Sequence, residues 1–411
     1  MLHVGLISIA LLASGPTTIA ADAISLPLRF VVEVGPDARA DTPVSVSLDG
    51  LADPLSPMRL VERTNGASTP TPAQLELGSP RRLWWIVKGA TPTDGRRVYE
   101  LRAGQPVGTS SIEVHATEAA LEIRRGDAKI LRYNRAHVPP PAGADPLYGR
   151  SAHIHPVWTP SGRVVTEQFP ADHMHQDGIW FALTRTEFEG RHPNFWDLHG
   201  KTGRVRFGRL HGTTSGTVYG GFRVENEHVD LSGPTEKVAL RETWDVRAWN
   251  VGGSAEGYWV FDVTSTLRCA TASPVTVLKY HYGGLAMRGA GDWYDERCRF
   301  LTSDGKTRAD GNHTRVRWCD MAGTSGDTWS GLAILSHPKN THFPEPIRIH
   351  PTMPYMCYAP SHVGPWSIEP GREHVSRYRF VVHDGSLEAE TANRIWRSFA
   401  EPLTVKVEKG S

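Results

Sequence analysis

The chain has 411 residues and a hydrophobic content of 39%, which is enough for one large core or for a large core with a smaller one beside it. Its formal net charge of +1 argues against capture of nucleic acid or of an anionic membrane by charge. The 40 glycines, 30 prolines and 13 tryptophans predict many short elements joined by tight turns, with aromatic surfaces of the kind that bind sugars.

The first predicted element is an apolar run at Val4–Ala13, which is too short to span a bilayer comfortably. Small residues follow it and fit cleavage after Ala20 or Ala21. We therefore interpret residues 1–21 as a signal peptide and expect a periplasmic or extracellular protein. No other run predicts a membrane span.

Residues 22–115 are predicted to form a small accessory β-sandwich. Short alternating runs are separated by turn residues such as those at 53–54 and 93–95. The expected strands are Leu28–Val34, Val44–Leu48, Leu83–Lys88 and Arg97–Leu101. This region has no dense polar cluster, so we expect no catalytic site in it.

A second unit is predicted over residues 116–411. Two short runs flank the turn at 125–127 and predict an opening hairpin, and one helix is expected at Leu387–Phe399. Further strands are expected at Arg204–Leu210, Thr217–Arg223, Val238–Trp249, Tyr258–Leu267, Val275–Tyr282, Gly331–Ser336 and His374–His383. So many strands in one unit favour a large antiparallel β-sandwich, and the predicted fold class is all-β.

Four cysteines lie in the C-terminal half of the chain, at Cys269, Cys298, Cys319 and Cys357. An even number in an exported protein permits disulfides, with three possible connectivities, and four small buried thiols are equally compatible with the pattern. None of them has the CxxC spacing of a structural zinc site.

The densest polar segment runs from Arg150 to Trp180 and holds two His-x-His pairs. His153 and His155 form the first pair, and His173 and His175 form the second. Alternate residues of a strand share a face, so each pair projects together, and a turn between the pairs can bring them side by side.

Clustered imidazoles serve as acids and bases near neutral pH, and they also bind divalent transition metals. Both uses stay open at this point, and so does the identity of any cofactor. The predicted catalytic residues are His155, Asp172, His173, His175 and His281, and a divalent metal could be held by His155, His173 and His175.

Other side chains in and near this segment are candidates for substrate binding. An arginine can clamp a carboxylate or a sulfate, and an aromatic ring can stack on a sugar. The predicted substrate-binding residues are Arg150, Trp158, Trp180, Tyr282 and Arg288. A loop at residues 195–199 adds the carboxylate of Asp197 and the imidazole of His199.

Several short motifs carry a family resemblance. They are Arg150-Ser151, Ile154-His155-Pro156, Thr159-Pro160-Ser161-Gly162, Phe169-Pro170, Asp172-His173, His175 and Gly178-Ile179-Trp180, and near the C-terminus Pro354-Tyr355, Gly364-Pro365-Trp366, Pro370-Gly371, Tyr378-Arg379 and His383-Asp384-Gly385. Together they resemble a secreted bacterial family of unknown function labelled "methane oxygenase PmoA". A membrane oxygenase needs several spanning helices, which this chain lacks, so the label does not carry that activity.

The resemblance implies a galactose-mutarotase-like β-supersandwich for the second unit, the fold of sugar epimerases, polysaccharide lyases and some glycoside hydrolases. It also implies an N-terminal module similar to those of secreted rhamnogalacturonan-lyase-type proteins. The chain departs from the family pattern at 175–177, where His-His-Arg is common, and at His153, which is often aromatic. His155, His173 and His175 are therefore the preferred candidates.

Three functions are compatible with these features. The first is a secreted carbohydrate-active hydrolase, lyase or epimerase that uses histidine acid/base or metal-assisted chemistry. The second is a copper or iron redox protein that uses the same histidines. The third is a non-catalytic glycan-binding protein. The sugar, the reaction, the metal and the oligomeric state stay open.

Overall fold

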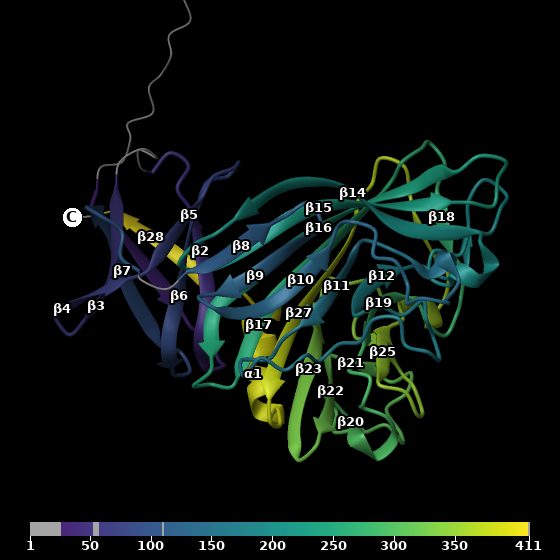
Figure 1. The fold of residues 1–411 in the computed structure, drawn as a ribbon. Helices are drawn as coiled ribbons and strands as arrows, with labels where there is room; N and C mark the ends of the chain where they lie inside the picture. The colour runs from purple at the N-terminus through teal and green to yellow at the C-terminus, as the bar shows by residue number, and fades with distance from the viewer. Residues whose placement is uncertain (1–25, 52–56, 109–110, 410–411) are drawn as a thin grey trace, which may run out of the picture.

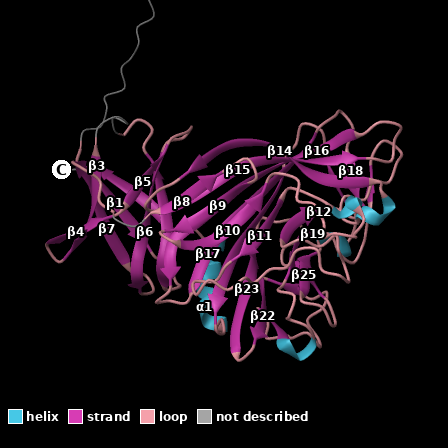
Figure 2. Ribbon diagram, in the orientation of Figure 1, coloured by secondary structure: helices cyan, strands magenta, loops and turns pink. Residues whose placement is uncertain are grey.

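The computed structural model describes residues 26–51, 57–108 and 111–409. Strands dominate these residues, and the single α-helix among them, α1 (Ala389–Ala400), coincides with the helix expected near the C-terminus (Figure 2). The predicted all-β fold class is confirmed. The predicted signal peptide lies outside the described residues. No helix within the described ranges has the length and apolar character needed to cross a membrane.

The first unit is a small sandwich of two antiparallel sheets. One sheet has the strand order β28-β1-β7-β3-β4, and the other has the order β2-β6-β5. The strands are β1 (Leu28–Glu33), β2 (Arg39–Ser47), β3 (Met58–Thr64), β4 (Ala67–Thr71), β5 (Ala73–Glu76), β6 (Arg82–Thr91), β7 (Arg96–Ala103) and β28 (Thr404–Lys409). Phe30, Trp85 and Tyr99 stack between the two sheets and form the centre of a small core.

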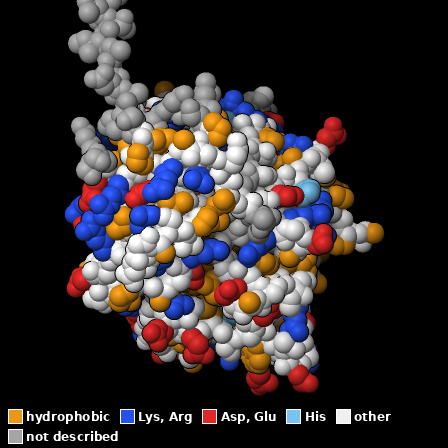
Figure 3. Space-filling view, turned by 90° about the vertical axis from the view of Figure 1, so that its left-hand side faces the viewer, with side chains coloured by type: hydrophobic (Ala, Val, Ile, Leu, Met, Phe, Trp, Pro, Cys, Tyr) orange, Lys and Arg blue, Asp and Glu red, His pale blue; other side chains and the backbone are white. Residues whose placement is uncertain are grey.

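The surface at this end of the molecule carries basic and acidic side chains interspersed with hydrophobic ones (Figure 3). The strand β28 comes from the far end of the chain and lies among the N-terminal strands in Figure 1. It pairs antiparallel with β1, and Lys406 Nζ lies 2.7 Å from Glu33 Oε2.

The predicted extent of the second unit, 116–411, did not anticipate this return, because the run at 404–409 is too short to reveal its partner. Leu403 and Val405 pack on the small core instead. The predicted boundary near residue 115 stays a prediction.

The second unit is built on two large antiparallel sheets. The nine-stranded sheet has the order β21-β24-β25-β19-β12-β11-β10-β9-β8, and the eight-stranded sheet has the order β14-β15-β16-β17-β27-β23-β22-β20. The strands of the first are β8 (Ile112–Ala116), β9 (Ala120–Arg125), β10 (Ala128–Asn134), β11 (His153–Val157), β12 (Ile179–Ala182), β19 (Gly284–Arg288), β21 (Arg315–Val316), β24 (Glu345–Ile349) and β25 (Tyr355–Tyr358). Those of the second are β14 (Gly203–Thr214), β15 (Tyr219–Asp230), β16 (Lys237–Gly253), β17 (Tyr258–Cys269), β20 (Cys298–Thr302), β22 (Trp318–Ser325), β23 (Thr328–Ser336) and β27 (His374–Asp384).

The main hydrophobic core joins residues of both large sheets. Phe261 of β17 and Phe380 of β27 stack at 4.6 Å inside it, with their strands in register. The predicted arrangement of a small sandwich followed by a large antiparallel supersandwich is confirmed. A smaller sheet extends it, with the order β13 (Thr186–Glu187), β18 (Val275–Val277), β26 (Trp366–Ile368).

The two units pack against each other through aromatic rings and an ion pair. Trp84 of β6 lies 5.3 Å from Trp249 of β16, ring centroid to ring centroid. Next to these rings, Arg247 Nη2 bonds to Glu76 Oε1 at 2.6 Å. The contact is therefore both apolar and charged.

Candidate functional site

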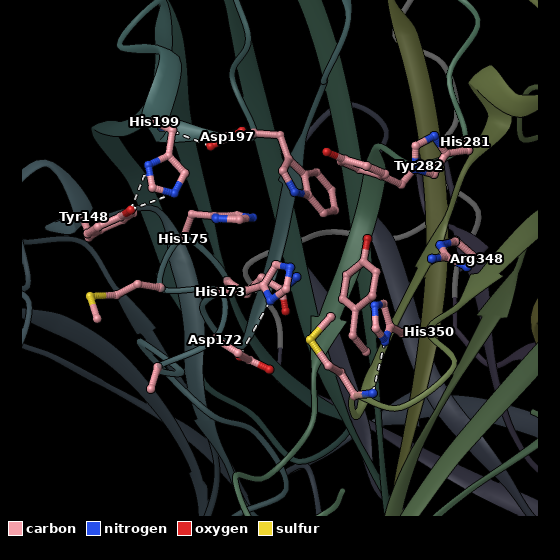
Figure 4. Close-up of a pocket in the computed structure, with 16 residues that line it drawn as sticks. Tyr148, Asp172, His173, His175, Asp197, His199, His281, Tyr282, Arg348 and His350 are labelled. Carbon is pink, nitrogen blue, oxygen red and sulfur yellow. Dashed lines mark hydrogen bonds and ion pairs between the residues drawn. The ribbon is translucent and has the colours of Figure 1, made fainter. Parts of the chain in front are cut away.

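A cavity of about 580 Å³ opens among the connections of the nine-stranded sheet. Its lining comes from the segments 146–148, 171–176, 196–199 and 281–282, and from strands β24 and β25 with the turn between them. Five histidines contribute to this lining: His173, His175, His199, His281 and His350. Figure 4 shows that they lie on two opposite walls, the first three on one side and the last two on the other.

Strand register places an aromatic layer under the cavity. Trp180 of β12 is opposite Ala286 of β19, and Arg288 of β19 is opposite Tyr355 of β25, so these side chains share one face of the sheet. Trp180 is fully buried, lies 4.9 Å from the Trp196 ring and stacks on Tyr355 at 6.3 Å. Trp196 and Tyr355 separate it from the cavity. The predicted role of Trp180 in stacking on a sugar is therefore wrong, because its ring has no exposed surface.

The first His-x-His pair does not reach the cavity. The connection after β11 folds back over it, and Gln168 Nε2 lies 2.6 Å from His153 Nε2 while Thr166 Oγ1 lies 2.9 Å from His155 Nδ1. Burial lowers the pKa of His155 to about 4. The structure does not bring His155 to the cavity with His173 and His175, because the loop that carries Thr166 covers it, and strand alternation cannot reveal such a loop. Its catalytic role stays a prediction.

The second His-x-His pair lines the cavity. The rings of His173 and His175 lie 5.7 Å apart with their planes inclined at 66°, and His175 is 9% exposed with no hydrogen-bond partner for its Nδ1. Burial lowers the pKa of His175 to about 4, although the carboxylate of Asp197 opposes this shift. The ring is therefore neutral at pH 7 and can accept a proton from a bound molecule.

Two buried arginines hold this wall in place from behind. Arg150 Nη1 donates to the backbone carbonyl of His175 at 2.8 Å and faces Asp177 Oδ2 at 3.4 Å. Arg288 donates to Asp172 Oδ1 at 2.9 Å and to Gln176 Oε1 at 3.0 Å. Neither guanidinium lines the cavity, so the predicted direct contact of Arg150 and Arg288 with substrate is replaced by a positioning role.

The Asp172 carboxylate forms an ion pair with the buried guanidinium of Arg288. Burial opposes its ionisation, but Arg288, with help from Tyr294 and His173, outweighs burial and lowers the pKa of Asp172. A carboxyl group in this state is ionised at all ordinary pH values and makes a poor proton donor.

A hydroxyl and an imidazole pair at the mouth of the same wall. Tyr148 Oη lies 2.9 Å from His199 Nε2, and the His199 ring lies 6.5 Å from the His175 ring. Burial, assisted by Asp145 and Asp197, raises the pKa of Tyr148, so the phenol keeps its proton at neutral pH. Asp197 also accepts the backbone N–H of His199 at 3.0 Å and fixes the start of the short helix η2 (Leu198–Gly200).

His350 faces the second histidine pair from the opposite wall, 6.3 Å from the His173 ring. Its Nδ1 accepts the backbone N–H of Met353 at 3.1 Å, which places the proton of the neutral ring on Nε2. Burial, with Arg348 second, lowers the pKa of His350 to about 4. His350 is therefore a neutral hydrogen-bond donor at pH 7.

Of the predicted residues, the structure brings five to the cavity: Asp172, His173, His175, His281 and Tyr282. Trp158 is not among the lining residues and has Lys129 over its ring at 5.3 Å. Tyr148, Arg348 and His350 were not predicted. For Arg348 and His350, the one sequence pattern that indicated a site was their spacing of two residues just before a proline.

The predicted metal ligands do not converge, since His155 lies under Thr166 and outside the cavity. Among residues 26–51, 57–108 and 111–409, no group of three or more His, Cys, Asp or Glu side chains is placed to hold a metal ion. The copper or iron redox alternative stays a prediction, which elemental analysis of protein purified without chelator can test.

The fold and the cavity define an all-β protein whose large antiparallel sandwich carries a histidine-rich pocket at its loops. The chain belongs to the family of unknown function DUF6807, whose model matches residues 120–397 and therefore includes every residue of the cavity. No curated protein matches this chain.

Two solved structures from Enterococcus faecalis align with the chain. One is described as a protein in the glycosyl hydrolase family 38, with a TM-score of 0.44 and 8% identity over 93% of this chain and 47% of that one. The other is an alpha-mannosidase from strain V583, with a TM-score of 0.46 and 9% identity over 94% of this chain and 46% of that one. The chain spans about half the length of either structure.

Proposed function

We propose that this protein is a secreted carbohydrate-active enzyme that moves protons on a sugar, with His175 as the general base. The observation that carries this proposal is the neutral imidazole of His175, which lines the cavity beside a hydroxyl–imidazole pair, Tyr148 and His199.

The two groups have complementary protonation states. His175 is unprotonated at pH 7 and can remove a proton from a carbon of the sugar. Tyr148 is protonated and can donate to a leaving oxygen, in which case the C–O bond breaks and a C=C bond forms. An epimerisation needs a proton donor on the opposite face of the carbon, and the Nε2–H of His350 on the opposite wall is the candidate for it.

The state of Asp172 favours proton transfer at carbon over glycosidic hydrolysis. Two-carboxylate hydrolysis needs one carboxyl with a raised pKa as proton donor. The ion pair with Arg288 holds Asp172 in the opposite state. Asp197, the second carboxylate of the cavity, caps η2 through the backbone N–H of His199.

The aromatic lining favours a sugar ring as the bound group. Tyr282 keeps part of its surface exposed and packs against Trp196 at 5.4 Å. Such a ring presents a flat apolar face to the C–H side of a sugar, while the surrounding imidazoles serve its hydroxyls. Export through the predicted signal peptide would place the enzyme where polysaccharide is available.

The test is incubation with a panel of oligosaccharides, read by mass spectrometry and NMR, for the unaltered chain and for His175→Gln. Unsaturated products, or a stereochemical change at constant mass, are expected from the unaltered chain. We expect His175→Gln to lose roughly a hundredfold or more in kcat, the usual scale for a general base. His115→Gln, at an exposed position in β8, is the matched control.

Three results would count against the proposal. Products that have gained water would indicate hydrolysis. Unchanged turnover in a folded His175→Gln variant would remove the base. Binding without any product across the panel would favour the non-catalytic glycan-binding alternative.

A further inference from the structure

The wall opposite His175 differs from it in carrying the positive charge of an arginine. Arg348 of β24 lies beside His281 and Tyr282 in Figure 4, across the cavity from His175 and His199. Its Nη1 is fixed by two neutral acceptors, Asn312 Oδ1 at 3.0 Å and the carbonyl of Ile349 at 2.9 Å. Neither acceptor neutralises the positive charge.

A second guanidinium lies near the same wall, in the segment that follows β12. Arg185 lies over the Tyr280 ring at 4.5 Å, and that ring packs against His281 and Tyr282. Within the described part of the chain, neither Arg348 nor Arg185 forms an ion pair with a carboxylate, whereas Arg288 behind the cavity forms two. Neither charge is therefore compensated by a carboxylate; Arg348 lines the cavity, and Arg185 lies behind the lining, over Tyr280.

Imidazoles lie next to these charges in fixed positions. His313 Nε2 bonds to the backbone carbonyl of His281 at 2.9 Å, and the His313 ring stacks on His362 at 4.0 Å. Burial lowers the pKa of His281, with Arg348 and Arg185 acting in the same direction. The imidazoles can donate hydrogen bonds, while the net positive charge comes from the arginines.

The acidic residues of the cavity lie toward the other wall. Asp172 is paired with Arg288, and Asp197 belongs to the segment that carries His199 (Figure 4). The cavity is thus asymmetric, with its proton-transfer groups on one side and unpaired positive charge on the other. A cleft with uncompensated charge of one sign attracts ligands of the opposite sign.

We propose that the Arg348 wall binds an anionic substituent, so that the substrate is an acidic glycan bearing a carboxylate or a sulfate. This inference rests on the proposed function, since it names the substrate class of the same cavity. Guanidinium groups pair with both anions through directed, charge-assisted hydrogen bonds. A carboxylate held here would also acidify the adjacent C–H, because the arginine stabilises the negative charge that develops when His175 removes the proton.

The experiment measures binding of matched glycans that differ only in charge. One pair is tetragalacturonate and its fully methyl-esterified form, and the other is a sulfated carrageenan oligosaccharide and its desulfated, neutral form. Calorimetry on the full chain is expected to show at least roughly tenfold tighter binding of the acidic member of one pair, weakened by salt. The pair that responds separates carboxylate from sulfate recognition.

Variants connect this preference to the wall. Arg348→Gln is expected to bind the acidic and neutral members equally, Arg185→Gln to lose part of the preference, and Arg348→Lys to keep part of it through its charge. Arg372→Gln, at an exposed position outside the cavity, is the control that keeps the full preference.

Equal binding of both members by the unaltered chain, failure to bind any acidic probe, or an undiminished preference in folded Arg348→Gln would each overturn the inference. A different result would contradict the proposed function. A His175→Gln variant that still turns over substrate removes the base, even if the charge preference is intact in that variant.

Discussion

Arg150 Nη1 donates to the backbone carbonyl of His175 at 2.8 Å, so a buried guanidinium fixes the main chain that carries the proposed base. The same group faces Asp177 Oδ2 at 3.4 Å, and Asp177 is itself completely buried. The position of His175 therefore depends on an ion pair that no solvent can replace.

Removal of this arginine is expected to destabilise the fold strongly. Arg150→Met leaves the Asp177 carboxylate buried with no cationic partner and only neutral hydrogen bonds, from the N–H of Phe169 and the side chain of Gln168, and breaking a buried pair in this way costs about 3–5 kcal/mol. Urea denaturation measures the loss. The double variant Arg150→Met/Asp177→Asn should recover much of it, because no unpaired charge remains. Equal stability of the single and double variants would contradict the ion-pair role.

The decrease in kcat/KM on the acidic side should occur at an unusually low pH for a reaction that depends on a histidine base. Because burial lowers the pKa of His175 to about 4, kcat/KM should stay flat below neutral pH and fall only as the pH approaches that value. The profile of kcat/KM against pH on an identified substrate measures this. A limb near the ordinary imidazole value of 6.5 would assign the base to another group. Circular dichroism at each pH separates loss of activity from unfolding.

A buried carboxyl away from the cavity should make stability depend on pH. Glu345 accepts hydrogen bonds from Asn340 Nδ2 at 2.9 Å and Tyr378 Oη at 2.9 Å, and burial raises its pKa to about 7 from 4.5. Since the folded pKa lies above the unfolded value, its contribution is full below about pH 4.5 and is lost as the pH rises through 7. Glu345→Gln should lack this decline when unfolding free energies are compared across that range. The exposed Glu373→Gln should keep it.

The four cysteines are free thiols, which resolves the choice between disulfides and buried thiols. Burial raises the pKa of Cys298 to about 12 and that of Cys357 to about 11, and Cys319 is completely enclosed. We expect a thiol reagent to modify only the half-buried Cys269 in the folded protein and all four thiols after unfolding. A mass deficit indicating an oxidised pair, or rapid labelling of several thiols in the folded protein, would contradict the structure.

The sequence was sufficient to predict the fold class and five residues of the cavity lining, two of them on the Arg348 wall. Alternation and turn residues predict an antiparallel sandwich, and the local spacing of His173 and His175 marks a polar segment. The same spacing misleads at His155, because its strand is covered by a loop whose path depends on bridges from Thr166 to Gly289 and from Gln168 to Asp177.

The residues of the opposite wall that were not predicted are brought there by strand pairing between distant parts of the chain. Arg348 and His350 reach the site because β24 pairs with β25, which pairs with β19 and through it with β12. The sequence at residues 348–350 has no local pattern that predicts these neighbouring strands. Trp180 shows the converse error, since an aromatic residue beside polar ones can be the buried support of a site and not its surface.

Deletion of residues 402–411 should destabilise the small sandwich selectively. The deletion removes β28, which leaves the edge of β1 unpaired and uncovers the apolar contacts of Leu403 and Val405. Limited proteolysis should then cleave within β1 to β7 first, and the truncated chain should self-associate at its open edge. The substitution Lys406→Gln, which keeps the strand, is the control. Unchanged protease resistance of the truncated chain would contradict the role of β28.

Because Lys406 bonds to a residue 373 positions before it, the small sandwich is a late product of synthesis. During synthesis of the intervening chain, one edge of β1 has no partner strand, and the large sandwich has time to fold first. The strand that completes the first sheet is then delivered by a domain that has already formed.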